Sequence, residues 1–475
     1  MVTRRRSSAI LGFALVLASA CGGSSNPPPP APGPGGGSGT ITGRERIGWL
    51  QQAPDDAQLA QFDYAIYVDG ARQVLAGDTC SPASGGSFDC SAALPPLSPG
   101  QHTLELAAFL EANGTVVESE RSAPLRVTVA ASSAPAGSTL PQDSAIVTSD
   151  GHQFRASIVA RGLDDPTDLA ISPDGRVFVI ERAGRVRISG PGAHGPEPAL
   201  VLENVVTSDE SGLTAIALHP EFDRNGYVYL AYSSEGRGGA GYRIARFRER
   251  GGVLAQGAIV ARERASVAQH AALRFGADGR LYAGLAAGPD PRDAQNPGSS
   301  LGKILRLNDD GTSPRDNPRA SPVFSSGHRE PRALAWDPLN GSLWALERDR
   351  VSGDELNAVT AGGDYGWPFA RGAGSIPAVL VLPAGTDVSG ASFVPPGTGS
   401  PLAGEMLVAS RGAQDLLRIR MDGGQPGLIE GMLQGRYGSI AAVHVSPDGT
   451  IYLATANRDT WGPGRDVVVT VTAAR

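Results

Sequence analysis

Lysine is almost absent from this chain: Lys303 is the only one in 475 residues. Any site that requires a lysine at another position is therefore excluded. No block of like charge follows the N-terminal segment and the net charge is −7, so a nucleic-acid partner is not expected. The sequence also offers no Ser/His/Asp nucleophile arrangement, no Cys/His zinc spacing and no phosphate-cradling glycine loop. Small molecules are the partners that these absences leave.

Aromatic residues and helical periodicity are scarce as well. Aromatics make up 6% of the chain, whereas 63 glycines and 37 prolines supply turns. No 3.6-residue period persists over a long window. We therefore predict an all-β chain, with two or more folded units because 475 residues exceed one ordinary core.

The first 21 residues have the pattern of an export signal, and no later stretch is long and apolar enough to span a membrane. Residues 4–6 are arginines, residues 10–17 are mostly apolar, and small residues precede Cys21. The segment resembles a bacterial lipoprotein signal. This implies lipidation of Cys21 and an exported protein anchored to the membrane at the cell envelope, on the periplasmic or outer-membrane side; ordinary cleavage that leaves a soluble protein is the alternative. Residues 22–40, rich in Gly, Ser and Pro, are expected to be a disordered tether.

Residues 41–130 alternate in short apolar runs with turn residues between them, which predicts a small β-sandwich. Trp49, the strand with Tyr64 and Tyr67, and residues 97–100 ahead of another strand resemble a fibronectin type III domain. The resemblance implies a spacer or docking module, which could hold a protein or glycan partner at the cell envelope.

Cys80 and Cys90 are the cysteines that remain once Cys21 is lipidated. They are close in sequence, and in an exported protein a disulfide is favoured over free thiols or a metal pair. A Ser/Ala/Pro linker is expected to follow at residues 131–150.

Residues 151–475 repeat one pattern six times: an apolar strand, a turn with Pro, Asp or Gly, and a second apolar strand. The strand pairs begin at Leu169, Ile216, Leu273, Leu334, Ala391 and Val443, and the turn glycines are Gly175, Gly226, Gly279, Gly341, Gly404 and Gly449. A repeat of this length is typical of propeller blades, which stack radially because one blade cannot cover its own faces. We predict a six-bladed β-propeller preceded by the small β-sandwich, with any site in the central channel.

Four motifs inside the repeats point to a family. They are Gly212 to Phe222, Leu301 to Arg306, Gly327 to Pro331, and Gly353 to Asn357 followed by Gly362 to Pro368. Their order over residues 162–457 resembles the soluble quinoprotein glucose and aldose sugar dehydrogenases, the glucose/sorbosone dehydrogenase family. The resemblance implies a periplasmic six-bladed propeller that binds pyrroloquinoline quinone (PQQ) and calcium and oxidises an aldose at C1 to a lactone. A base takes the C1 hydroxyl proton as hydride passes to the quinone.

Four residues match functional positions of the family. Arg329 stands where the family places an arginine on the cofactor, with a surface salt bridge as the alternative. Arg436 matches the first arginine of a second cofactor contact. Glu355 and the backbone of Tyr365 match a structural calcium site; retention of the loop for turn geometry alone is the alternative.

The catalytic position departs from the family. The family histidine, counted back from Phe275, falls on Ala268, so His270 is the base only if the chain has a two-residue deletion there. Otherwise His270 is an ordinary polar residue. Ala286 and Ala287 replace an acidic residue that contacts substrate in the family.

The cofactor positions depart too. Residues 347–350 read Glu-Arg-Asp-Arg where the family has Glu-x-Gly-Pro, whose carbonyls hold calcium. Two arginines would repel a cation, and Arg348 or Arg350 could replace it.

Three further cofactor contacts are changed. Glu210 and Glu330 stand where the family has glutamine and asparagine, and Arg411 is the nearest substitute for the family lysine. A PQQ-dependent sugar dehydrogenase is the preferred hypothesis. The alternatives are a catalytically altered or inactive propeller that binds a carbohydrate or protein partner at the cell envelope, and a hydrolytic use of the channel.

Overall fold

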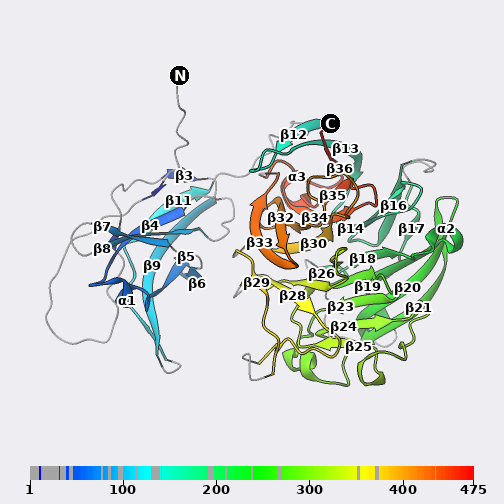
Figure 1. The fold of residues 1–475 in the computed structure, drawn as a ribbon, viewed down its shortest axis with the longest axis horizontal. Helices are drawn as coiled ribbons and strands as arrows, with labels where there is room; N and C mark the ends of the chain where they lie inside the picture. Colours follow the sequence, from blue (N-terminus) through cyan, green and yellow to red (C-terminus); the bar gives the residue numbers. More distant parts are fainter. Residues whose placement is uncertain are drawn as a thin grey trace. The chain divides into compact units, whose positions relative to one another are not determined.

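The chain folds into two compact units, seen in Figure 1. The first comprises residues 1–137 with 383–385, and the second residues 138–382 with 386–475. The computed structural model describes residues 10–11, 31–32, 39–41, 46–75, 79–83, 87–94, 100–112, 115–129, 140, 142–190, 197–208, 211–236, 239–264, 270–349, 353–369, 374–383, 385–433 and 435–474.

The prediction of an all-β chain is confirmed, because strands dominate both units. The α-helices of the described ranges are single turns, α1 (Asp56–Leu59), α2 (Phe222–Asn225) and α3 (Arg458–Trp461), with 3-10 turns at Pro291–Gln295 and Pro318–Ala320. None of these helices has the length and apolar character needed to cross a bilayer.

The first unit consists of two sheets that share one core. One sheet has the order β1-β4-β8-β7, with β2 on β4, and the other β3-β11-β9-β5-β6, with β10 on β9. The strands are β1 (Ile10–Leu11), β2 (Ala31–Pro32), β3 (Gly39–Ile41), β4 (Arg46–Gln52), β5 (Asp63–Val68), β6 (Ala71–Leu75), β7 (Thr79–Ala83), β8 (Ser87–Ala93), β9 (Gly100–Ala112), β10 (Thr115–Glu118) and β11 (Leu125–Val129). Trp49 of β4 packs on Tyr64 of β5 with ring centroids 4.6 Å apart. Cys80 and Cys90, the expected pair, form a disulfide between β7 and β8.

The second unit consists of six sheets. Five have four strands, in the orders β14 to β17, β18 to β21, β22 to β25, β26 to β29 and β30 to β33; the sixth has the order β12-β13-β36-β35-β34. The strands are β12 (Asp143–Val147), β13 (Gln153–Leu163), β14 (Pro166–Ile171), β15 (Val177–Glu181), β16 (Arg185–Ser189), β17 (Leu200–Val201), β18 (Leu213–Leu218), β19 (Tyr227–Gly236), β20 (Gly239–Arg250), β21 (Val253–Arg264), β22 (Ala271–Phe275), β23 (Leu281–Leu285), β24 (Lys303–Leu307), β25 (Val323–Ser326), β26 (Pro331–Trp336), β27 (Leu343–Glu347), β28 (Glu355–Val359), β29 (Leu380–Val381), β30 (Val388–Phe393), β31 (Met406–Ser410), β32 (Asp415–Asp422), β33 (Gln425–Gly431), β34 (Ile440–Val445), β35 (Ile451–Thr455) and β36 (Asp466–Ala473).

The innermost strands of the six sheets form a closed ring. β14, β18, β22, β26, β30 and β34 each contact the next in this order, and β34 contacts β14. Each strand pair predicted from the repeats forms the two innermost strands of one sheet. The sixth sheet joins the two ends of the unit, because β13 pairs with β36.

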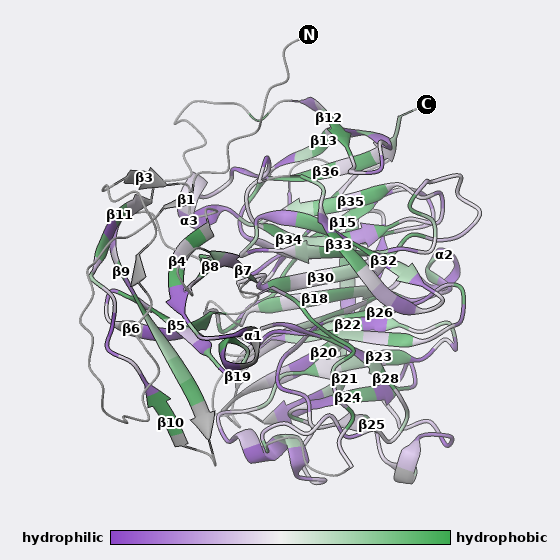
Figure 2. Ribbon diagram, turned by 60° about the vertical axis from the view of Figure 1, so that its left-hand side comes forward, coloured by the Kyte–Doolittle hydropathy of each residue, from purple (hydrophilic) through white to green (hydrophobic). Residues whose placement is uncertain are grey.

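The ring is held by apolar clusters between neighbouring sheets. Each of six clusters takes its residues from two successive sheets, and Figure 2 shows hydrophobic residues along these strands. Burial of this apolar surface is the main force that stabilises such a stack. The turn at Gly226 requires glycine because its φ of 66° lies in the left-handed region. A Cβ at this position would also lie 2.6 Å from the Glu249 carbonyl oxygen.

Strands lie within three N-terminal segments that were expected to be a leader, a tether and a linker. The linker predicted for residues 131–150 overlaps β12, where Ile146 is buried in the core of the sixth sheet. β1 lies in the predicted leader and β2 in the predicted tether; both pair with β4, whose edge opposite β8 is open to them. Cys21 lies outside the described residues.

Candidate functional site

Three arginines occupy equivalent positions in three sheets. Arg182 directly follows β15, Arg348 follows β27 and Arg411 follows β31, the second strand of the sheet in each case. Because the first and second strands are antiparallel, the second strand ends at the edge where the first begins. The fold therefore gathers these side chains at one end of the ring.

His270 lies at the same end, directly before β22, and is only 7% exposed. Its carbonyl oxygen accepts hydrogen bonds from the Tyr242 hydroxyl and from the Ala286 N–H, at 3.3 Å for the latter. It lines a cavity of about 10 Å³, which has room for about one water. Side chains of four other sheets line this cavity too: Thr167, Thr214, Arg332 and Ser389.

The surroundings of His270 are positively charged. Burial, followed by the charges of Arg332, Arg411, Arg182 and Arg348, holds the pKa of its imidazole well below the usual value. Both causes disfavour the protonated ring. His270 is therefore neutral at neutral pH and able to accept a proton.

We call Arg182, Arg332, Arg348 and Arg411 the arginine cluster. Within it, Arg332 and Arg348 share the carboxylate of Glu330, to which Arg348 donates at 3.0–3.1 Å. Arg348 also donates to Asp387 at 3.3 Å. Glu330, which the resemblance places at the cofactor, holds two guanidinium groups in place.

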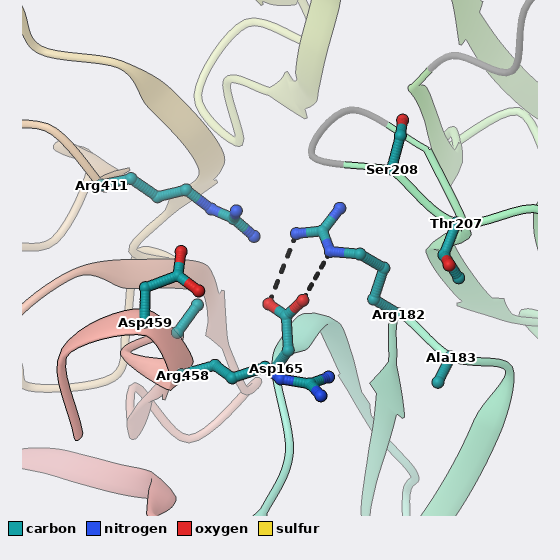
Figure 3. Close-up of a pocket in the computed structure, with 9 residues that line it drawn as sticks. Asp165, Arg182, Ala183, Thr207, Ser208, Arg411, Arg458 and Asp459 are labelled. Carbon is teal, nitrogen blue, oxygen red and sulfur yellow. Dashed lines mark hydrogen bonds and ion pairs between the residues drawn. The ribbon is translucent and has the colours of Figure 1, made fainter. Parts of the chain in front are cut away.

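A pocket of about 360 Å³ opens beside the cluster (Figure 3). Arg182 donates to both carboxylate oxygens of Asp165 in it, at 2.6 and 3.4 Å. Arg411 points toward Arg182 and forms no ion pair within the described ranges; its buried Nε lacks a hydrogen-bond partner. Burial and the nearby Arg182 lower the pKa of Arg411 to about 10. The remaining lining residues are Ala183, Thr207, Ser208, Ala456, Arg458 and Asp459.

Arg329 contacts this end of the ring through its backbone. Its carbonyl oxygen accepts the Ala287 N–H at 2.7 Å, whereas its guanidinium pairs with Asp349 and lies 4.5 Å from the centre of the Trp367 ring. Within the described ranges no hydrogen bond or ion pair joins Arg329 to His270. The cofactor contact predicted for Arg329 stays a prediction, and the alternative, a salt bridge, is present with Asp349.

The expectation that Arg436 contacts the cofactor is not supported by its position. Arg436 is exposed, and its Nη1 donates at 2.7 Å to the Ala145 carbonyl of β12, the outermost strand of the sixth sheet. A loop motif alone does not determine which way its arginine points. Glu210, Arg350 and Ala268 lie outside the described residues.

A Ser–His–Glu arrangement is present, although none was expected. The Ser325 hydroxyl lies 2.8 Å from His328 Nε2, and His328 Nδ1 lies 2.6 Å from Glu347 Oε1. These residues are 1%, 0% and 4% exposed, so no substrate can reach the hydroxyl. Glu347 also accepts the Arg329 N–H at 2.8 Å, which makes the network a support for the loop after β25.

The predicted ligands for a structural calcium ion lie in and after β28. Glu355 begins β28 opposite Glu347, while Tyr365 stacks on His328 and donates its hydroxyl to the Ala358 carbonyl at 2.6 Å. The described part of the chain contains no group of three or more His, Cys, Asp or Glu side chains that could hold a metal. Calcium at Glu355 and the Tyr365 carbonyl stays a prediction from the resemblance.

Sequence reasoning missed Arg182 and Arg332. The signal for Arg182 was available: an arginine directly after the second strand of a repeat recurs at Arg348 and Arg411. Arg332 lies inside β26, one residue after its start, and nothing local distinguishes it from a solvent-facing arginine.

A comparison with protein families matches residues 163–461 to the model described as Glucose / Sorbosone dehydrogenase. An uncharacterised protein of Synechocystis is 35% identical over 251 residues, and the aldose sugar dehydrogenase YliI of Escherichia coli is 30% identical over 222 residues. These matches cover 47% and 44% of this chain, and the chain spans 61% and 60% of the length of the two relatives. The PQQ-bound structure of an aldose sugar dehydrogenase from Streptomyces coelicolor superposes with a TM-score of 0.59 and 28% identity, over 71% of this chain and 100% of that one.

Proposed function

From the premise that the chain belongs to the glucose/sorbosone dehydrogenase family, we propose that it is a PQQ-dependent oxidoreductase that oxidises an aldose sugar at C1 to a lactone. The observation that carries the proposal is the pocket lined by Arg182 and Arg411, whose charges also act on His270. The six sheets would be the blades of a six-bladed propeller. The first unit would be a fibronectin type III-like sandwich.

The donors of the pocket suit the cofactor. PQQ carries carboxylates and quinone oxygens, and Arg411 offers a buried guanidinium nitrogen without a hydrogen-bond partner. Arg411 and Arg182 would hold these oxygens, and PQQ, when bound, supplies the hydride acceptor.

His270 would act as the base. It can take the proton of a sugar hydroxyl because it is neutral, and its backbone is fixed by Tyr242 and Ala286. An anion bound among the arginines would offset their charge and raise the pKa of His270, which makes it a better proton acceptor in the loaded protein.

The test is dye reduction by purified protein loaded with PQQ, with a panel of aldoses. His270→Ala should lower kcat by roughly 10²–10⁴-fold and leave the Kd of PQQ within about threefold, because its role is proton transfer. His152→Ala is the matched control: His152 lies near Asp150, in the turn between β12 and β13, and its loss should leave kcat unchanged. Equal activity of His270→Ala and the parent protein would refute the assignment of the base.

A second candidate function is a propeller without this chemistry that binds a carbohydrate or protein partner at the cell envelope. It is favoured by Ala286 and Ala287 in place of an acidic substrate contact, and by the small cavity at His270. Binding of a sugar by calorimetry without dye reduction at saturating PQQ would favour it.

Export and anchoring belong to the proposal as well. Lipidation of Cys21 would place the protein at the membrane, on the periplasmic or outer-membrane side. Cys21→Ala should release it from the membrane fraction, and its continued sedimentation with membranes would exclude a lipid anchor at this residue.

A further inference from the structure

Asp459 is an acidic side chain in the wall of the pocket beside the arginine cluster. It is the second residue of α3 and is exposed. Among the residues that the structure describes, none forms a hydrogen bond or an ion pair with its carboxylate. The other carboxylate that lines this pocket, Asp165, accepts two hydrogen bonds from Arg182. Asp459 is therefore the pocket carboxylate that is left to meet a ligand.

A buried support fixes the place of Asp459. α3 begins after Asn457, which is 5% exposed. The Asn457 N–H donates to the Asp466 carboxylate at 2.7 Å, and its side-chain oxygen accepts the Ser439 N–H at 2.8 Å. The Asn457 carbonyl oxygen accepts the Trp461 N–H at 2.7 Å, which closes the turn of α3. Because the fold already holds this turn in place, little entropy is lost when a ligand binds to it.

Two arginines that line the pocket with Asp459 do not pair with it. Arg458, its neighbour in α3, has its Nη1 3.6 Å from Asp164 Oδ1. Arg411 lies on the same side of the pocket as Asp459 in Figure 3, yet no ion pair within the described ranges joins the two. The charge of Asp459 is therefore not neutralised by a protein contact in this part of the chain.

A carboxylate in this position suits the hydroxyl groups of a sugar. An ionised carboxylate accepts hydrogen bonds and donates none, and its two oxygens can serve two hydroxyls on adjacent carbons. Hydrogen bonds from a hydroxyl to a carboxylate are shorter and roughly twice as strong as those between neutral groups. PQQ carries carboxylates, which the charge of Asp459 would repel. A bound cofactor would therefore leave Asp459 to the sugar.

We propose that Asp459 determines which sugars the pocket accepts, because its carboxylate receives hydrogen bonds from hydroxyl groups of the aldose. The substrate class is then an aldose without a carboxylate, since a uronic acid would bring a second negative charge to Asp459. This role rests on the proposed function, because the pocket must hold PQQ and the sugar together.

The first measurement is dye reduction by the PQQ-loaded full chain, with the aldose that has the highest kcat/KM in the panel. Asp459→Asn keeps the size of the side chain and loses its charge. Its KM should rise at least about tenfold, while kcat and the Kd of PQQ stay within about threefold of the parent values. The preference in kcat/KM for this aldose over the corresponding uronic acid should fall at least about tenfold.

The second measurement uses the monodeoxy forms of the same aldose. In the parent protein, removal of the hydroxyl that Asp459 binds should lower kcat/KM at least about tenfold, whereas in Asp459→Ala the same removal should change it less than about twofold. A residue that only supports the fold would lower kcat/KM for every form of the sugar by the same factor. Such equal losses would overturn the inference.

The matched control is Asp223→Asn. Asp223 is exposed, is the second residue of the single-turn helix α2, and lines a different pocket, so its loss should leave KM unchanged. A thermal melt of each variant reports folding, and Asp459→Ala carries the test if Asp459→Asn does not fold.

The outcomes separate this inference from the proposed function. An active parent protein whose KM is not raised by Asp459→Asn would overturn the inference and leave the proposed function standing. A rise in the Kd of PQQ as large as that in KM would do the same, because Asp459 would then contact the cofactor. A parent protein that binds no PQQ, or that reduces no dye with any aldose, would overturn the proposed function and this inference with it.

Discussion

Two groups of arginines in the second unit differ in how many carboxylates they meet. In the rim network, Arg418 of β32 is 2% exposed and pairs with Asp150, Glu405 and Glu430, while Arg420 also reaches Asp150. Here carboxylates outnumber guanidinium groups. In the arginine cluster, by contrast, Arg411 forms no ion pair within the described residues, and its buried Nε lacks a hydrogen-bond partner.

On the proposed function, the difference separates a structural role for Arg418 from a ligand-binding role for Arg411. The carboxylates around Arg418 raise the pKa of its guanidinium, whereas burial and neighbouring arginines lower that of Arg411 to about 10. A cation saturated with protein carboxylates stabilises the fold. A cation left short of them is stabilised by an anionic ligand, which the protein must bind from solution.

The rim network should give the largest effect on stability. Arg418→Ala leaves three carboxylates close together without their shared partner, and we expect a loss of about 3–5 kcal/mol in the free energy of unfolding. Urea denaturation measures it. Arg155→Ala, which breaks an exposed pair with Asp143, is the control and should cost less than about 1 kcal/mol. A comparable loss in both variants would remove the distinction between this network and ordinary surface pairs.

The arginine cluster should give the opposite result. Arg411→Ala removes the guanidinium without an ion pair, so the free energy of unfolding should change by less than about 1 kcal/mol, while the Kd of PQQ rises by roughly tenfold to a hundredfold, as expected for a charge-assisted hydrogen bond. Calorimetry and urea denaturation of the same preparation measure the two quantities. An Arg411→Ala protein that is strongly destabilised yet binds PQQ normally would show that the two groups do not differ in role.

The comparison also explains what sequence reasoning reached. The inner strands were predictable because apolar runs and turn glycines such as Gly226 act locally. Arg348 and Arg411 were candidates from the resemblance, but the grouping of the arginine cluster was not predictable, because its members come from three separate sheets and only the closed ring brings them together. Arg436 is a residue whose local motif fits the family but whose contacts could not be predicted from that motif. Its side chain donates to a backbone carbonyl of β12, which is distant in sequence. β12 itself was taken for linker because it directly follows a stretch rich in Ser, Ala and Pro.

A further prediction concerns the pH dependence of stability, and it compares a carboxyl group near the arginine cluster with one in the rim network. Asp354 is 4% exposed and accepts N–H groups of Asp349 and Val388, the latter beside Asp387. Burial raises the pKa of Asp354 to about 6. In contrast, hydrogen bonds from Arg418 and Thr148 hold the pKa of Asp150 well below its usual value.

The two groups should therefore shift stability in opposite directions. Asp354 has a folded-state pKa above that of the unfolded chain, so its stabilising contribution is complete below about pH 4 and is lost as the pH rises through about 6. Its size is about 2–3 kcal/mol for a shift of this order.

Asp150 has a folded-state pKa below the unfolded value, so its contribution is present above about pH 4 and is lost as the pH falls. Urea denaturation between about pH 3.5 and 7.5 checks both. Asp354→Asn should flatten the plot of unfolding free energy against pH between about pH 4 and 6.5. Asp150→Asn should flatten only the acidic end of that plot. If Asp354→Asn changes the acidic end, or Asp150→Asn changes the range from about pH 4 to 6.5, the two regions are not electrostatically distinct.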